Sequence, residues 1–200
     1  MLYIEQIKNR SCINSKHKYN LDDVVIVNTT SSSKNWSKEL SPFYIGPVNL
    51  YDGYTSKNFE NTWQYSKVYK QHTDELGNPT EEYWNWAKAG WNDDWAHRYP
   101  MGLGAIPLYS LWQGEKLGYI AARKKIYIPL YKEAVSKTEA YKQLIELYKE
   151  CNRYNKGLYL LDHDGYNHKL IDMTYDDVVN CETKKMGHAF VLGMMLEGII

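Results

Sequence analysis

The residues best suited to chemistry lie at the start of a predicted helix, where Glu60 follows an aromatic-rich loop and an Asp-Gly turn. Gln64 and Lys67 follow at helical spacing, so all three side chains share one side of the helix. A carboxylate in a first helical turn is stabilised by the helix dipole, by about 0.3–1 kcal/mol. Phe59 and Trp63 add an apolar face beside it, and the Gln64 amide can orient the carboxylate or a water. The arrangement suits a nucleoside-processing pocket, although the spacing alone is common on ordinary helix surfaces.

Arg98 and Arg123 form the second candidate set, because the chain has only four arginines and these two lie among apolar residues. A guanidinium offers a fixed pair of donors that fits a phosphate or a carboxylate. Both arginines flank a glycine-rich stretch, which indicates a diphosphate contact. Ordinary surface ion pairs are the alternative interpretation.

The run Asp162-His163-Asp164-Gly165 follows a short apolar stretch and resembles the start of some calcium loops. The later glutamate that such a loop needs is missing, so a turn with a hydrogen-bonding acid fits better. His163 and His168 have no third ligand at zinc spacing, and we therefore predict no metal site.

The remaining reactive groups give weaker signals. His188 lies in an apolar helical stretch, which is typical of a core histidine rather than a catalyst. Cys151 has no evident histidine partner, so a thiol nucleophile is not indicated. The sequence contains no serine-hydrolase elbow, phosphate-binding loop or dinucleotide fingerprint, and we predict no cofactor.

Composition limits the classes of partner. The 200 residues carry 24 basic and 24 acidic side chains, so no net field favours strong nonspecific nucleic-acid binding. No stretch approaches the roughly 20 apolar residues that span a bilayer, and the first residues lack the apolar core of a signal peptide. Three cysteines without paired spacing suit a reducing compartment. We expect a cytoplasmic protein without a membrane partner.

Aromatic residues are unusually frequent, with 19 tyrosines and seven tryptophans. The tyrosines fit either an aromatic pocket or the codon bias of an AT-rich genome. Five of the tryptophans crowd into one region: Trp84, Trp86, Trp91, Trp95 and Trp112.

Hydrophobic periodicity predicts a mostly helical α+β domain with a few short strands. The expected strands are Leu2–Ile7, Val24–Thr30, Tyr44–Tyr51 and Leu158–Leu161. The expected helices are Ser56–Gln71, Glu81–Trp95, Gly118–Ile128, Lys137–Arg153 and Lys184–Gly198. The segment Arg98–Gly118 is expected to be a long ordered loop. Residues 1–35 are expected to form an arm or accessory layer beside a single domain of residues 36–200, with a tryptophan-rich insertion around residues 74–118.

The pieces around Glu60 resemble the NADAR (YbiA-like) family. The resemblance starts with Leu40-Ser41-Pro42-Phe43, continues from Pro47 to Asp52-Gly53, and is most specific in the helix Asn58–Lys67, NFENTWQYSK. Further matches follow at Ala122-Arg123, at the acidic turn of Asp162 or Asp164, and from Gly187 through Leu196. In all, the resemblance covers roughly residues 38–198.

The resemblance implies a NADAR-like fold and an N-glycosidase acting on ADP-ribose attached to a base, including ADP-ribosylated guanine in DNA. Glu60 would be the catalytic carboxylate, Gln64 its orienter, Lys67 an auxiliary cation, and Asp162 or Asp164 a second carboxylate. The implied substrate-binding residues are Phe43, Asp52, Gly53, Asn61, Trp63, Arg98, Trp112 and Arg123. No metal or redox cofactor is implied, and a phage-encoded enzyme in the host cytoplasm that reverses ADP-ribosylation is one plausible setting.

Several positions depart from the family pattern. Asn61 replaces the histidine after the glutamate, Pro42 replaces an asparagine, Tyr166 a tryptophan, and Phe190 stands near the place of another asparagine. These changes fit a different substrate or a fold kept without activity. The rival interpretation is therefore a non-catalytic module that sequesters an ADP-ribose-type nucleotide. A structural phage protein with an aromatic interaction surface is the third.

Overall fold

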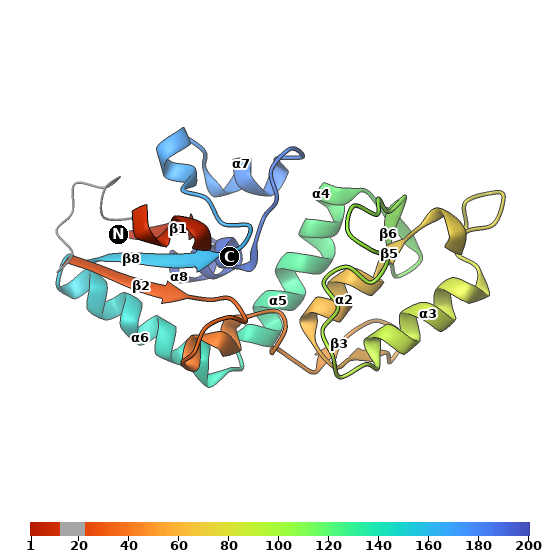
Figure 1. The fold of residues 1–200 in the computed structure, drawn as a ribbon, viewed down its shortest axis with the longest axis horizontal. Coiled ribbons are helices and arrows are strands. Elements are labelled where there is room, and N and C mark those ends of the chain that lie inside the picture. Colours follow the sequence, from red (N-terminus) through yellow and green to blue (C-terminus); the bar gives the residue numbers. More distant parts are fainter. Residues whose placement is uncertain (13–22) are drawn as a thin grey trace. The chain divides into compact units, whose positions relative to one another are not determined.

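The computed structural model describes residues 1–12 and 23–200, in which helices and short strands are mixed (Figure 1). Contacts divide the chain into two compact units. The discontinuous unit comprises Met1–Ser41 and Val135–Ile200, and the continuous unit comprises Pro42–Ala134. We predicted an arm of residues 1–35 beside one domain of residues 36–200, and this division into two units is not among the predicted boundaries. The sequence gives no sign of it, because the second boundary falls within helix α5 (Ile128–Val135) and not in a Gly- or Ser-rich linker.

A three-stranded parallel sheet forms the centre of the discontinuous unit. Strand β8 (Gly157–Asp162) lies between β1 (Leu2–Gln6) and β2 (Val24–Asn28). Every residue of β8 is buried, which agrees with its continuous apolar run, since a central parallel strand is covered on both faces. Residues 1–35, which we expected to be an arm or accessory layer, thus supply both outer strands of this sheet; residues 13–22 lie outside the described part.

Helices cover this sheet. Helix α6 (Glu139–Arg153) and helix α8 (His188–Leu196) both pack on β8, and α8 also packs on β1. The side-chain oxygen of Thr138 caps α6 by accepting the backbone N–H of Tyr141 over 3.1 Å. The unit is completed by α7 (Tyr175–Asn180) and the 3-10 turns η1 (Ile7–Cys12), η3 (Trp36–Leu40) and η6 (His168–Ile171).

The continuous unit contains short elements around an aromatic core. Its helices are α2 (Phe59–Tyr65), α3 (Glu81–Trp91) and a run made of α4 (Tyr119–Ala122), the π-helical turn η5 (Arg123–Tyr127) and α5. Its strands are β3 (Val48–Asn49) with β4 (Thr55–Ser56), and β5 (Lys67–Val68), β6 (Tyr109–Trp112) and β7 (Glu115–Leu117) in one antiparallel sheet. A single 3-10 turn, η4 (Lys70–His72), follows β5.

The tryptophan-rich segment forms much of this core and is not a peripheral insertion. Trp91 and Trp112 are buried, and Trp84 and Trp86 pack against the same cluster. Trp95 is the exception, with 79% of its side chain exposed.

Several predicted elements need correction. The helix expected over Ser56–Gln71 ends at Tyr65, because the chain then enters β5, whose Lys67 pairs with Ser110 of β6. The Arg98–Gly118 segment, expected to be a loop, contains the β6–β7 hairpin. The strand expected over Tyr44–Tyr51 is only the two residues of β3. None of the helices in the described residues is long and apolar enough to cross a membrane.

Candidate functional site

Helix α2 presents Glu60 in a rigid setting. Its N-cap is Asn58, whose side-chain oxygen accepts the backbone N–H of Asn61 over 2.8 Å. The backbone N–H groups of Phe59 and Glu60, which no helical carbonyl can reach, donate to the carbonyls of Ile45 (2.8 Å) and Pro42 (2.9 Å). The first turn is therefore bonded to the preceding loop, and the start of α2 has little freedom to shift.

A chain of hydrogen bonds runs along one side of α2. Lys67 Nζ donates to Gln64 Oε1 over 2.7 Å, and Gln64 Nε2 donates to Glu60 Oε1 over 2.8 Å. Because an ammonium can only donate, the contact with Lys67 fixes which way the Gln64 amide points. Glu60 and Gln64 are both 7% exposed, so the carboxylate is held in a largely water-excluded place. The contact expected between Gln64 and Glu60 is present.

Aromatic rings lie beside this chain. The ring centroid of Trp63 lies 5.1 Å from that of Tyr127 in an edge-to-face arrangement, and Phe59 contacts Tyr127 in the same way at 5.1 Å. Lys67 Nζ lies 5.1 Å from the centre of the Trp63 ring, which adds a cation–π contact. Tyr127 belongs to the π-helical turn η5, so η5 packs directly against α2.

Arg123 begins this π-helical turn. Its side chain is 1% exposed, its Nη2 donates to Tyr119 Oη over 2.8 Å, and its guanidinium carbon lies 4.1 Å from the Tyr119 ring centre. Insertions of this kind in α-helices occur frequently at functional sites. No pattern in the sequence indicated the π turn or the positions of Tyr119 and Tyr127 beside the site.

Asn61 does not fit the substrate-binding role that we predicted. Its side chain is fully buried, and its Nδ2 lies within hydrogen-bond distance of the carbonyls of Gly90 (2.9 Å), Asp93 (3.2 Å) and Trp95 (2.8 Å). Its Oδ1 accepts the backbone N–H of His97 over 2.8 Å. The amide is thus fully occupied in holding the segment after α3 against α2.

The other predicted binding residues lie in varied places. Trp112 belongs to the aromatic core, 9% exposed and 4.8 Å from Tyr51 in an edge-to-face contact, so it is not a free stacking surface. Asp52 and Gly53 form the exposed turn between β3 and β4, with φ angles of 52° and 76° that favour glycine at the second position. Arg98 is half-buried, 5.4 Å from the Tyr99 ring, and Phe43 is half-buried next to Pro42.

Asp162, a predicted second carboxylate, is anchored inside the discontinuous unit. It is 3% exposed, its Oδ2 lies 3.1 Å from His188 Nδ1 and accepts the N–H of Ala189 over 3.0 Å, and its Oδ1 accepts the N–H of Asp164 over 3.4 Å. Burial alone would raise the pKa of the Asp162 carboxyl, but the charge and hydrogen bond of His188 and the two backbone N–H groups hold that pKa below its usual range. A Cβ on Gly187 would collide with this carboxylate.

This environment makes Asp162 a poor catalytic group, since its oxygens are occupied and shielded from solvent. Asp164 is half-buried and lies 4.0 Å from Lys185 Nζ. Neither residue belongs to the unit that carries Glu60. Across the described ranges, no three or more His, Cys, Asp or Glu side chains are grouped so that they could hold a metal ion.

The geometry defines a mixed helix-and-strand protein in which one short helix holds a buried carboxylate and an amide beside aromatic rings, and the strand after it supplies a lysine. The chain belongs to a family of unknown function (DUF6939), which matches residues 8–189. No curated protein and no solved structure matches it. The family has no assigned activity, and the chemistry of the Glu60 site is therefore the basis for inferring a function.

Proposed function

We propose that the protein is an N-glycosidase that hydrolyses the bond between ADP-ribose and a base, with ADP-ribosylated guanine as the first substrate to test. The observation that carries this proposal is the bonded chain from Lys67 through Gln64 to Glu60. It involves the same positions that resemble the NADAR helix motif. The reversal of ADP-ribosylation by a toxin or defence system, in the cytoplasm, is the setting that we propose, and a phage-encoded counter-defence protein is one form of it.

The proposed reaction needs a fixed negative charge and an activated water. Breaking the bond between ribose C1′ and the base nitrogen builds positive charge on the ribose, which an adjacent carboxylate stabilises. Glu60 supplies this charge and accepts the proton of the attacking water, whose oxygen bonds to C1′ as the bond from C1′ to the base nitrogen breaks. The nitrogen keeps the bonding electron pair and takes up a proton from solvent. A single general acid–base group of this kind contributes about 10²–10⁴-fold to the rate.

The neighbouring residues receive supporting roles. Gln64 is a positioning residue, because its donated hydrogen bond fixes one oxygen of Glu60, and Lys67 acts through Gln64. Trp63 is the stacking candidate for the base or the ribose. Arg98 suits the diphosphate better than Arg123 does, because Arg98 is half-buried whereas Arg123 is 1% exposed.

A specific observation favours a second candidate function. Asn61 occupies the place of the family's histidine, and its amide is bonded to four backbone groups and cannot take up a proton. Without a second titrating group, the pocket would bind an ADP-ribose-type nucleotide and release it unchanged. The protein would then sequester a nucleotide signal.

One experiment separates the two functions. Wild type, Glu60→Gln and the control Glu81→Gln, which changes an exposed glutamate in the first turn of α3, are mixed with ADP-ribosylated guanosine, a guanine-modified oligonucleotide, NAD and ADP-ribose. Mass spectrometry follows the free base and free ADP-ribose. Release by wild type and Glu81→Gln but not by Glu60→Gln supports the glycosidase. A ligand that is retained with unchanged mass by all three supports sequestration, and neither release nor binding contradicts both proposals.

A further inference from the structure

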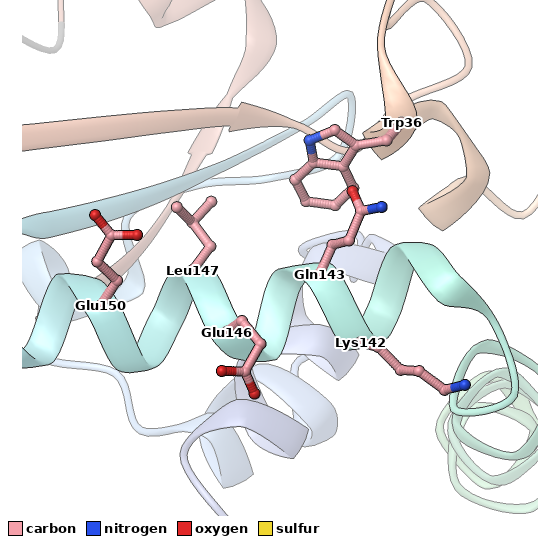
Figure 2. A pocket seen from close by; sticks show the side chains of 6 residues that line it. All are labelled: Trp36, Lys142, Gln143, Glu146, Leu147 and Glu150. Atoms are coloured by element: carbon pink, nitrogen blue, oxygen red, sulfur yellow. The ribbon is translucent and has the colours of Figure 1, made fainter.

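A groove of about 450 Å³ lies on the discontinuous unit between η3 and α6 (Figure 2). Its lining consists of Trp36, Lys142, Gln143, Glu146, Leu147 and Glu150. Its volume falls in the range of about 300–1,000 Å³ that is usual for ligand sites.

Both walls of the groove are fixed in place. Trp36 opens η3, where Asn35 caps the turn by accepting the backbone N–H of Ser37 over 3.0 Å. Ser37 Oγ donates to the carbonyl of Asn28 at the end of β2 over 2.6 Å, and Leu40 at the end of η3 is fully buried. Helix α6, which forms the floor, packs on β8. A ligand would therefore meet a preorganised surface, which lowers the entropic cost of binding.

The lining residues divide into two sets. Lys142 pairs with Glu139 over 2.6 Å, and Glu146 pairs with Lys149 over 2.7 Å. Figure 2 shows Lys142 and Glu146 directed away from Trp36, whereas Gln143, Leu147 and Glu150 project toward the side of α6 on which Trp36 lies.

The polar side chains of the second set are available to a ligand. Within residues 1–12 and 23–200, the side chains of Gln143 and Glu150 have no hydrogen-bond or ion-pair partner. From one end to the other, the groove thus offers an indole, an amide, an aliphatic side chain and an unpaired carboxylate.

We propose that this groove binds an extended segment of a partner protein, with an apolar side chain against Trp36 and a basic side chain paired with Glu150. Seven helical residues separate Gln143 from Glu150, or about 10.5 Å along the axis. Three residues of extended chain cover about the same distance, at about 3.3 Å each. With the apolar residue beside Trp36 and Gln143, the basic residue that reaches Glu150 is therefore three positions away, and the Gln143 amide faces the backbone at the apolar residue, to which it can both donate and accept.

The test uses defined peptides and the full-length protein. The probe is acetyl-Leu-Ser-Ser-Arg-amide, and acetyl-Leu-Ser-Ser-Glu-amide and acetyl-Ser-Ser-Ser-Arg-amide are its controls. Chemical shifts of the Trp36 indole N–H and of α6 backbone amides report binding during titration. We expect the first peptide to shift these signals at millimolar concentration and the acidic peptide to leave them unchanged. Free arginine amide that bound as tightly as the peptide would contradict a segment-binding site.

Matched variants test the geometry. Glu150→Gln should weaken binding about two- to fivefold, as is usual for an exposed ion pair, whereas Glu146→Gln should leave it unchanged. Trp36→Ala should weaken it about tenfold, as for an aromatic anchor, and Trp36→Phe should keep most of the affinity, which separates loss of contact from loss of fold. Equal effects of the two glutamate changes, or a Trp36 signal that no peptide shifts, would overturn the proposal.

Discussion

The imidazole of His188 lies between two acceptors: its Nδ1 is 3.1 Å from the Asp162 carboxylate and its Nε2 is 2.9 Å from the carbonyl of Thr29. The Thr29 carbonyl and an ionised Asp162 carboxylate can only accept, so both contacts are hydrogen bonds when each ring nitrogen carries a proton. The two side chains then form a buried ion pair that ties the end of β8 to the residue after β2 and to the start of α8.

Removing the charge of Asp162 should destabilise the discontinuous unit. Asp162→Asn leaves a buried imidazolium without its counter-charge, which costs about 3–5 kcal/mol of unfolding free energy. Because the pKa of Asp162 is lowered on folding, its contribution is present above the unfolded pKa of about 3.9 and is lost as the pH falls below that value. Urea unfolding between pH 5 and pH 2 should show little change down to about pH 4 and a continuing loss below it for wild type, with a flatter profile for Asp162→Asn. The control Asp164→Asn, whose partner Lys185 lies 4.0 Å away, should lose less than about 1 kcal/mol, and an equal loss would contradict the ion pair.

If Glu60 is the catalytic carboxylate, Lys67 should influence turnover through Gln64. Lys67→Met removes the donor that fixes the Gln64 amide, so kcat should fall by about tenfold with KM little changed, whereas Glu60→Gln should cost about 10²–10⁴-fold. Lys70→Met changes an exposed lysine of η4 nearby and serves as the control. Steady-state release of the base from ADP-ribosylated guanosine provides the measurement. A rise in KM with unchanged kcat would assign Lys67 to substrate binding instead.

Asn61 should matter for stability more than for chemistry. Asn61→Ala removes contacts to three backbone carbonyls and one backbone N–H of the 90–97 segment, at about 1 kcal/mol for each bond whose partner is left unsatisfied. The carbonyls of Gly90 and Asp93 keep a second donor each, so the Trp95 carbonyl and the His97 N–H should contribute most. Asn61→His, which introduces the residue type of the NADAR motif, cannot reproduce four contacts in a fully buried site and should also destabilise. Denaturant unfolding and proteolysis within residues 92–97 are the measurements. An Asn61→His protein with wild-type stability and higher turnover would show that this position acts in catalysis.

Two tyrosines of the same core should respond in opposite ways to removal of the hydroxyl. In the described part of the chain, Tyr51 Oη has no hydrogen-bond partner, whereas Tyr83 Oη donates to the carbonyl of Tyr65 over 3.1 Å. Tyr51→Phe should therefore be neutral or stabilising, and Tyr83→Phe should cost about 1 kcal/mol. Equal losses for the two variants would contradict this assignment.

The raised pKa of Tyr51 allows a second test, which measures stability at alkaline pH. Burial, with the nearby Asp52 and Tyr54, raises the pKa of Tyr51 to about 12. Its neutral phenol thus supports folding below the unfolded pKa of about 10, and this support is lost as the pH rises toward 12. Tyr51→Phe should make stability less sensitive to alkali above pH 10, as followed by unfolding at fixed urea concentration.

Local patterns in the sequence predicted the elements whose hydrophobic pattern lies within the element itself. The apolar runs of β1, β2 and β8 and the amphipathic face of α6 were found near their true bounds. Helix α2 was overextended, because pairing of Lys67 with Ser110, far along the chain, decides where it ends. Sequence spacing contains no information about such a partner.

The site shows the same contrast. Glu60 and Gln64 were identified together because helical spacing brings them side by side, and Lys67 follows closely enough to reach Gln64 although it lies in β5. Asn61 and Asp162 were assigned to substrate and catalysis because their bonding partners, the 90–97 segment and His188, are distant in the sequence. The sequence showed only that these residues are polar. The fold showed that their polar atoms already contact other groups of the protein.

The position of β8 between β1 and β2 has a consequence for synthesis on the ribosome. The continuous unit is one uninterrupted stretch, Pro42–Ala134, so it can begin to fold as soon as that stretch has left the ribosome. By contrast, β1 and β2 must wait for residues 157–162 before either has a neighbour in the sheet. During that interval the nascent chain exposes two unpaired apolar strands, which are open to association with other chains or capture by a chaperone. The interval from residue 28 to residue 157 is therefore the vulnerable stage in the making of this protein.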